Sequence, residues 1–332
     1  MKKIILAALA VVATLAVSAR AKDKPYKLNI PLGLSANALV VPDDNPMTEA
    51  KVELGHQLFF DNRWGKKSAI SCASCHLPDH GWSDPRQFSL NTEGKPTPRH
   101  SPTVINRAFA DIQKWNGASK SIDELSGHLP FMDPAEQVKA LSGVRSYRRQ
   151  FKKVFGSEVT SENVAKAIAA YVRTIMSGNS AYDRFQAGDK SALSDSAQRG
   201  LALFEGKANC VQCHAGPNFS DEGFRNIGVG MDKNPALAGR SEVTKKDADI
   251  GAFKTPTLRD VAKRGPYMHD GSLATLDDVI AFYDKGGNPN PHLAPEIKPL
   301  GLSDGEKADL KAFLVSLNGD IDPATSKVPR LP

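Results

Sequence analysis

The sequence has 332 residues, of which 43 are Lys or Arg and 37 are Asp or Glu, so its formal charge is +6. Because charges of both signs are interspersed and the excess is small, nothing in the balance indicates binding to nucleic acid or to a membrane surface. A mildly basic surface can still attract an acidic protein partner. The length predicts two domains.

The N-terminus has the features of a secretory signal peptide. A basic start at residues 1–3 precedes an apolar run over 4–17 and a small-x-small cleavage site at 19–21. The run is shorter than the roughly 20 residues of a membrane-spanning helix, and no later stretch is long enough. We expect a mature chain from about Lys22 that has no membrane span and resides in the periplasm, with the cell surface as the alternative.

All four cysteines lie in two Cys-x-x-Cys-His motifs, one at Cys72, Cys75 and His76 and one at Cys210, Cys213 and His214. Cysteines of an exported protein ordinarily suggest disulfides, but a histidine directly after each pair is what c-type haem attachment requires. The thiols bind the vinyl groups on one edge of the macrocycle, and the histidine becomes the proximal iron ligand. The sequence therefore predicts two covalent c-type haems, with His76 and His214 as iron ligands.

The surroundings of the two motifs repeat. A Gly-to-Phe segment precedes each motif, at residues 55–60 and 200–204. An aromatic-Ser-Asp segment follows each, within residues 81–84 and 218–221. Each half of the chain thus predicts a helix, a haem-attachment turn and a polar loop.

Helical patterns dominate elsewhere. Ser161 can cap a helix whose apolar positions share one face and which ends near Gly178. Thr275 can open another helix, and Ser303 with Glu306 forms a capping box before a third. Strand-like alternation is scarce, so the sequence predicts a mainly α protein.

The expected organisation is two cytochrome c-like domains, each with one covalent haem. We place the signal peptide at residues 1–21, the N-terminal haem domain at 22–185 and the C-terminal haem domain at 186–332. The Gly- and Ser-rich stretch 178–194 is the predicted junction.

Further motifs occur in a specific order: Pro102-Thr103, Trp115-Asn116-Gly117, Pro134-Ala135-Glu136, Pro256-Thr257-Leu258-Arg259 and the segment 266–271. In order and spacing, over nearly all of the mature chain, they resemble those of the bacterial dihaem cytochrome c peroxidases and MauG. The resemblance implies a haem peroxidase-type oxidoreductase that uses hydrogen peroxide and a protein electron donor or protein substrate. We expect a monomer or a homodimer.

The resemblance also implies how the first haem reacts. A peroxidase haem needs an open axial face with a proton-transfer group above it. Glu136 corresponds to the distal glutamate of the family and Pro130 to a distal-pocket proline, although Glu136 alone would suit a solvated helix start. Thr92 stands where some relatives have a second histidine ligand, so we expect an open haem. Ser126 replaces a pocket glutamine, and His128 is an alternative ligand.

Two features are implied between the haems. Trp115 corresponds to the tryptophan that lies between them in the family, a place equally suited to a core residue that packs two domains together. The family also binds calcium there. Arg264 and Pro266 would supply backbone carbonyls, but His100 replaces the family asparagine, and calcium prefers oxygen ligands. Calcium would then need water to complete its coordination.

The second haem decides between functions. Fourteen residues after His269, cytochrome c peroxidases of the family have a methionine ligand and MauG has a tyrosine; here the residue is Tyr283. A thioether raises the haem potential, whereas a phenolate favours ferric and higher states. Met268 is the rival ligand, and Tyr283 would otherwise be a core residue.

Three functions follow from these readings. The first is a MauG-like enzyme that uses peroxide and high-valent haem iron to oxidise tryptophan or tyrosine of a partner, with a copper-binding protein as one candidate. The second is a cytochrome c peroxidase that reduces hydrogen peroxide to water with electrons from a small cytochrome. The third is a dihaem electron-transfer protein without catalysis, which Glu136 and Pro130 above an open haem disfavour.

Overall fold

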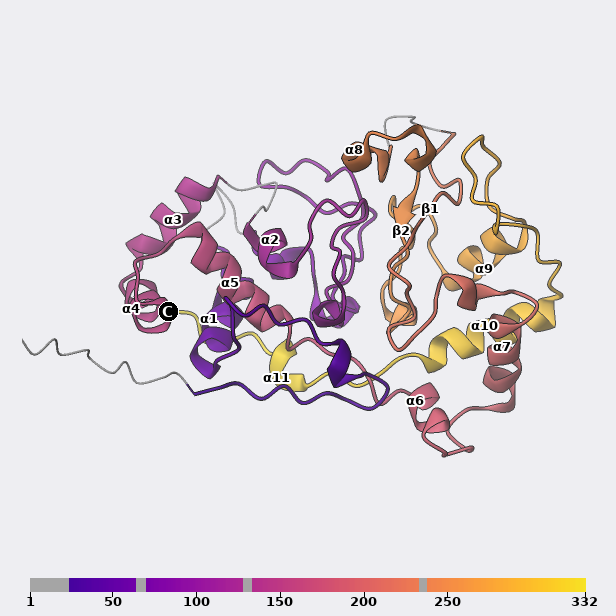
Figure 1. The fold of residues 1–332 in the computed structure, drawn as a ribbon, viewed down its shortest axis with the longest axis horizontal. Coiled ribbons are helices and arrows are strands. Elements are labelled where there is room, and N and C mark those ends of the chain that lie inside the picture. The colour runs from indigo at the N-terminus through magenta and orange to yellow at the C-terminus, as the bar shows by residue number, and fades with distance from the viewer. Residues whose placement is uncertain (1–23, 64–69, 128–132, 233–237) are drawn as a thin grey trace, which may run out of the picture.

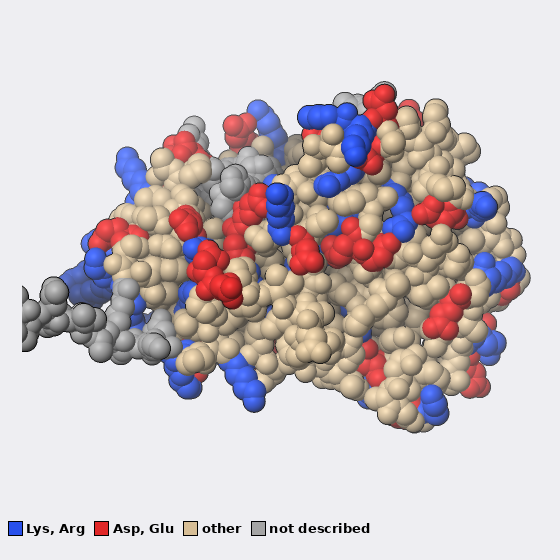
Figure 2. Space-filling model, in the orientation of Figure 1, with Lys and Arg blue, Asp and Glu red and all other residues tan. Residues whose placement is uncertain are grey.

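The computed structural model describes residues 24–63, 70–127, 133–232 and 238–332, and the predicted signal peptide lies outside them. Within these ranges no helix has the length and hydropathy to cross a bilayer. Basic and acidic side chains are interspersed on the face shown in Figure 2, in keeping with the small charge excess.

The described residues form a mainly helical fold, as predicted. Among these residues the only ladder is a pair of two-residue strands, β1 (Phe224–Arg225) and β2 (Phe253–Lys254), which are antiparallel. The α-helices are α1 (Glu49–Phe60), α2 (Ile122–Gly127), α3 (Pro134–Gly143), α4 (Arg145–Phe155), α5 (Ser161–Val172), α6 (Ala181–Gln186), α7 (Asp195–Glu205), α8 (Ser241–Thr244), α9 (Leu276–Asp284), α10 (Asp304–Ser316) and α11 (Pro323–Ser326). Figure 1 shows two lobes: α1 to α5 form the N-terminal lobe, and α7 to α10 with both strands form the C-terminal lobe.

Each lobe is built on one closely packed helix pair, α1 with α5 and α7 with α10. A glycine permits the close approach in each pair. A Cβ on Gly55 would lie 1.9 Å from the Ala167 carbonyl oxygen, and one on Gly200 would lie 2.0 Å from that of Asp309. Since α1 and α7 lead into the Cys-x-x-Cys-His motifs, the predicted repeat is present in three dimensions.

The aromatic cores of the two lobes are also equivalent. Phe59, Trp82 and Tyr171 form one cluster, with ring centroids 5.2 to 6.5 Å apart. Phe204, Phe219 and Phe313 form the other, with centroids 5.0 to 6.3 Å apart. In both lobes the ring that follows the haem motif packs on the helix pair, which fixes the motif relative to the core.

The capping predictions are confirmed with one correction. Thr275 caps α9, and Ser303 with Glu306 forms the capping box of α10. For α5 the cap is Thr160, whose hydroxyl accepts a bond from the Asn163 N–H at 3.1 Å, and the helix ends at Val172, well before Gly178. Ser161 instead donates to the Pro134 carbonyl.

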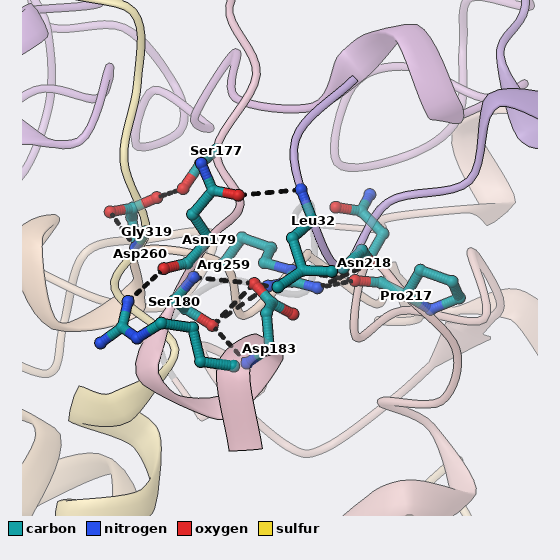
Figure 3. Close-up of polar contacts among 12 residues, drawn as sticks. Leu32, Ser177, Asn179, Ser180, Asp183, Pro217, Asn218, Arg259, Asp260 and Gly319 are labelled. Carbon is teal, nitrogen blue, oxygen red and sulfur yellow. Dashed lines mark hydrogen bonds and ion pairs between the residues drawn. The ribbon is translucent and has the colours of Figure 1, made fainter. Parts of the chain in front are cut away.

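The lobes meet at Ser177, a fully buried residue (Figure 3). From the N-terminal lobe, Asn106 accepts a bond from the Ser177 N–H at 2.8 Å and donates to its carbonyl at 3.0 Å. From the C-terminal lobe, Asp260 accepts a bond from the Ser177 hydroxyl. Asn106 and Asp260 both have a left-handed backbone, with φ of 57° and 54°. Each of them follows its Pro-Thr motif at the same distance. Ser177 is therefore bound by equivalent residues of the two repeats.

A buried ion pair adds a second junction between the N-terminal segment and the C-terminal lobe (Figure 3). Arg259 lies 2.6 Å from Asp183 and donates to the carbonyls of Pro217 and Gly33. Because the pair is buried, loss of either partner would leave an uncompensated buried charge and destabilise the fold.

The C-terminal segment returns to the N-terminal lobe, where Figure 1 shows α11 beside α1 and α5. Tyr171 donates to the Thr325 carbonyl at 2.5 Å, and Arg63 donates to the Pro332 carbonyl at 2.6 Å. Thr325 and Pro332, which the predicted division assigns to the C-terminal haem domain, thus contact the N-terminal lobe.

We expect Gly200→Ala to destabilise the protein, because the new methyl group would overlap the Asp309 carbonyl at the α7–α10 contact. Overpacking of this kind costs about 1–3 kcal/mol, which a fall in the midpoint of chemical denaturation would measure. Gly143→Ala is the control: Gly143 lies in α3 and has nothing within 4 Å of an added Cβ. Equal effects of both substitutions would contradict the packing role of Gly200.

Candidate functional site

Both Cys-x-x-Cys-His motifs form the same short turn. Residues Cys72–Ser74 and Cys210–Gln212 are single 3₁₀ turns. In each, the histidine N–H donates to the carbonyl of the first cysteine, at 3.0 Å for His76 and 2.9 Å for His214. The four thiols form no disulfide. Two thiols and an imidazole on one turn are the donor set for a covalent haem.

The two histidines are oriented alike. The Nδ1 atom of His76 lies 3.3 Å from the Trp82 carbonyl oxygen, and that of His214 lies 2.9 Å from the Phe219 carbonyl oxygen. When Nδ1 donates its proton to a carbonyl, the Nε2 lone pair is left for a metal. Burial lowers the pKa of both histidines to about 4, so the rings are neutral, as an iron ligand must be.

Two threonines, from the Pro-Thr motifs to which the sequence analysis gave no role, hold the carbonyl that directly precedes each acceptor residue. Thr103 donates to the Gly81 carbonyl at 2.7 Å, and Thr257 donates to the Asn218 carbonyl at 2.6 Å. The next residues, Trp82 and Phe219, adopt a left-handed backbone with φ of 58° and 49°. The signal for this role was present in the repeated Pro-Thr dipeptide.

A cavity of about 400 Å³ adjoins the second motif. Cys210, Cys213 and His214 line it, and so do both candidates for the other axial position, Tyr283 from α9 and Met268. Burial, followed by the nearby Cys210 and Cys213, raises the pKa of Tyr283, so the phenol stays neutral in the absence of a positive charge. These residues fit a haem with an axial ligand opposite His214.

Trp115 lies between the lobes and lines the same cavity. Its indole N–H donates to the His100 carbonyl at 2.8 Å, and its ring centroid lies 6.4 Å from that of His269. Its own carbonyl accepts a bond from the Lys254 N–H at 2.8 Å. An indole in this place can serve both packing and electron transfer.

The residues predicted for calcium do not fit that ion. The Nε2 atom of His100 lies 3.1 Å from the Ser83 hydroxyl, and its Nδ1 lies 3.2 Å from the carbonyls of Arg86 and Gln87. Both ring nitrogens thus have partners already. The side chain of Arg264 places a positive charge at the same junction. Pro266 follows a cis peptide bond.

The distal side of the first haem is only partly within the described residues. Glu136 lies in the first turn of α3, which the Asp133 side chain caps, and its Oε2 atom is buried. Pro130 and His128 lie outside the described residues, as does the side chain of Ser126. The position of Glu136 over the first haem therefore stays a prediction.

Comparisons with known proteins identify relatives of this arrangement. Residues 49–191 match the model of the family described as di-haem cytochrome c peroxidase. The methylamine utilization protein MauG of Methylorubrum extorquens is 40% identical over 300 residues, which cover 88% of this chain and 84% of that protein. Cytochrome-c peroxidase IdrP1 of Denitromonas iodatirespirans is also 40% identical, over an alignment of 361 positions that covers 96% and 93% of the two chains.

Solved structures agree with the sequence relatives. A MauG-like protein associated with microbial copper homeostasis superposes with a TM-score of 0.82 at 30% identity, covering 92% of this chain and 99% of that one. The diheme peroxidase BthA of Burkholderia thailandensis has the same fold, with a TM-score of 0.74 at 19% identity over 93% and 98%. The relatives are enzymes, which disfavours a purely electron-carrying role. With its two equivalent haem-attachment turns, the chain belongs to the di-haem cytochrome c peroxidase and MauG family of haem-dependent oxidoreductases.

Proposed function

We propose that this protein is a MauG-like oxidoreductase that uses hydrogen peroxide to oxidise tryptophan or tyrosine residues of a partner protein. The observation that carries the proposal is Tyr283, a half-buried tyrosine whose phenol lines the cavity of the second haem-attachment motif. Covalent c-type haems at Cys72 and Cys75 and at Cys210 and Cys213 would supply the one-electron chemistry with peroxide.

Tyr283 matters because the second axial ligand sets what its haem can do. A methionine thioether stabilises ferrous iron and suits an electron acceptor that serves small cytochromes. A tyrosinate stabilises ferric and higher states, which suits removal of electrons from another protein. No hydrogen-bond partner of the Tyr283 hydroxyl is found within the described ranges, so the hydroxyl is available to a ligand in the cavity.

The chain's other residues have separable roles. His76 and His214 hold the iron from the proximal side, each oriented by its Nδ1 contact. Glu136 would move a proton from the inner to the outer oxygen of peroxide, which drives cleavage of the bond between them. Trp115, between the lobes, would shorten the path for electrons from one haem to the other.

The partner is proposed to be a protein in the periplasm, with the cell surface as the alternative compartment. The signal-peptide pattern at residues 1–21 supports export. The MauG-like structural neighbour is described as associated with microbial copper homeostasis, which supports a copper-binding protein as the substrate.

The alternative is a cytochrome c peroxidase that reduces hydrogen peroxide with electrons from a small cytochrome. The similarity to cytochrome-c peroxidase IdrP1 along nearly the whole chain favours it. Turnover of peroxide with reduced small cytochrome separates the two functions. Fast, sustained oxidation of the cytochrome would favour the alternative, whereas slow cytochrome turnover with oxidation of aromatic residues on a candidate partner supports the proposal.

We expect Tyr283→Met to convert the second haem to a thioether-ligated one. The ferric protein should show one high-spin and one low-spin haem, and the variant should lose the tyrosinate signature in absorption and resonance Raman spectra while its potential rises. Tyr267→Phe is the matched control, because Tyr267 lines the same cavity but donates to the Val261 carbonyl at 3.0 Å. Absence of the tyrosinate signature in the wild-type protein, with a low-spin second haem that is lost in Met268→Leu but kept in Tyr283→Met, would assign the ligand to Met268 and contradict the proposal.

We expect Glu136→Gln to slow the reaction of the ferric protein with stoichiometric peroxide by about 10²–10⁴-fold, the usual contribution of a general acid–base group. Stopped-flow absorption at the haem bands measures this rate. Glu162→Gln is the control, since Glu162 also lies in the first turn of a helix and pairs with Lys166 on the surface. An unchanged rate in Glu136→Gln would remove the residue from the peroxide reaction.

A further inference from the structure

Four arginine side chains are buried in the part of the chain that the structure describes. Three of them face a carboxylate: Arg259 with Asp183, Arg173 with Asp123, and Arg107 with Glu222. The exception is Arg264, which has no ion pair within the described ranges although its exposed fraction is only 9%. Burying a cation without a counter-ion costs free energy, so binding of an anion beside Arg264 would stabilise the protein.

Arg264 lies where the two haem-attachment loops meet. Its Cβ packs so closely on Gly81, in the loop that orients His76, that a Cβ on that glycine would lie 3.0 Å away. Its guanidinium donates to the carbonyl of Thr257, whose hydroxyl fixes the loop that orients His214. The side chain also lines the cavity of the second motif.

The guanidinium has unused binding capacity. Its Nε–H is buried and has no hydrogen-bond partner in the described part of the chain. Burial lowers the pKa of Arg264 to about 10, and the charges of Tyr267 and Asp260 offset only part of this loss of hydration. A second buried nitrogen on the cavity wall, Nε2 of His269, likewise lacks a partner among the described residues.

The chemistry of the cavity identifies the anion. Thioether bonds at Cys210 and Cys213 hold the vinyl edge of a haem, so its two propionate carboxylates lie on the opposite edge. Among the other cations that line the cavity, Arg225 is already paired with Asp221 and Glu296, Lys254 with Glu222, and Lys207 with Glu306, while Lys298 is exposed. Of the buried cations that line the cavity, Arg264 is therefore the one left for a carboxylate.

We propose that Arg264 binds a propionate of the haem attached at Cys210 and Cys213, and that its fixed positive charge takes the place of a calcium ion between the lobes. Both imidazole nitrogens of His100 already have partners, and the charge of Arg264 lies near enough to depress the pKa of His100 further. A divalent cation at this junction would meet a like charge instead of a ligand. The proposal depends on a haem at the second motif and on nothing about the partner protein.

Redox titration of the holoprotein tests the propionate contact. In Arg264→Met the carboxylate loses its counter-ion, and the uncompensated negative charge stabilises ferric iron, so the potential of the second haem should fall while that of the first changes less. Arg264→Lys keeps the charge and should retain most of the wild-type potential. Lys263→Met is the control, because Lys263 is the neighbouring cation but is 44% exposed and pairs with Asp260. An unchanged potential in Arg264→Met, or an equal fall in Lys263→Met, would overturn the proposal.

The wild-type holoprotein supplies a test that needs no variant. After purification in the presence of a chelator, we expect less than one calcium per chain by elemental analysis, and no change in haem spectra, potentials or thermal midpoint when calcium is restored. The variant His100→Asn with Arg264→Thr should instead acquire a calcium-dependent thermal midpoint. One tightly held calcium per wild-type chain, with haem spectra that change on chelation, would refute the replacement of calcium by Arg264.

Discussion

The bond from each haem-attachment histidine to a main-chain carbonyl is the constraint on which the site depends. It selects the ring tautomer that leaves Nε2 for iron, and it holds only because a left-handed residue turns the carbonyl of Trp82 or Phe219 toward the ring. Threonine hydroxyls and the aromatic clusters fix those turns from behind. The same arrangement of histidine, carbonyl and threonine occurs twice, so each lobe orients one imidazole.

In the C-terminal lobe the structure also shows what faces that imidazole. In the C-terminal lobe, helix α9 and the turn at Met268 enclose a cavity with a phenol, a thioether and an unpaired guanidinium on its walls. Equivalent proximal geometry with unequal opposite faces is what allows two similar cofactors to have different potentials and different reactions. In the C-terminal lobe, the groups that can set the reactivity of a haem thus lie on the side that the repeated motif does not build.

How much of this could be read from the sequence depended on the range of the interaction. The attachment motifs, the helices before them and the caps at Thr275 and Ser303 are local patterns, and they were predicted correctly. The Thr160 cap was missed because Ser161 satisfies the same pattern one residue later. Two features could not be predicted: the contact of the two lobes at Ser177 and the role of the Arg264 side chain. Each depends on residues brought together from distant parts of the chain. The family resemblance assigned a role only to the backbone carbonyl of Arg264, as a calcium ligand, and gave no information on its guanidinium.

The return of the C-terminal segment to the N-terminal lobe has a consequence for how the protein matures. Tyr171, at the heart of the first aromatic cluster, is bonded to the Thr325 carbonyl, so that lobe is complete only after the last residues of the chain have emerged. In the folded protein the Cys72 thiol is buried, and burial raises its pKa to about 12, which disfavours the reactive thiolate. Closure of the lobe therefore leaves this thiol in its protonated, less reactive form, and the C-terminal segment is the last part of the chain available to close it.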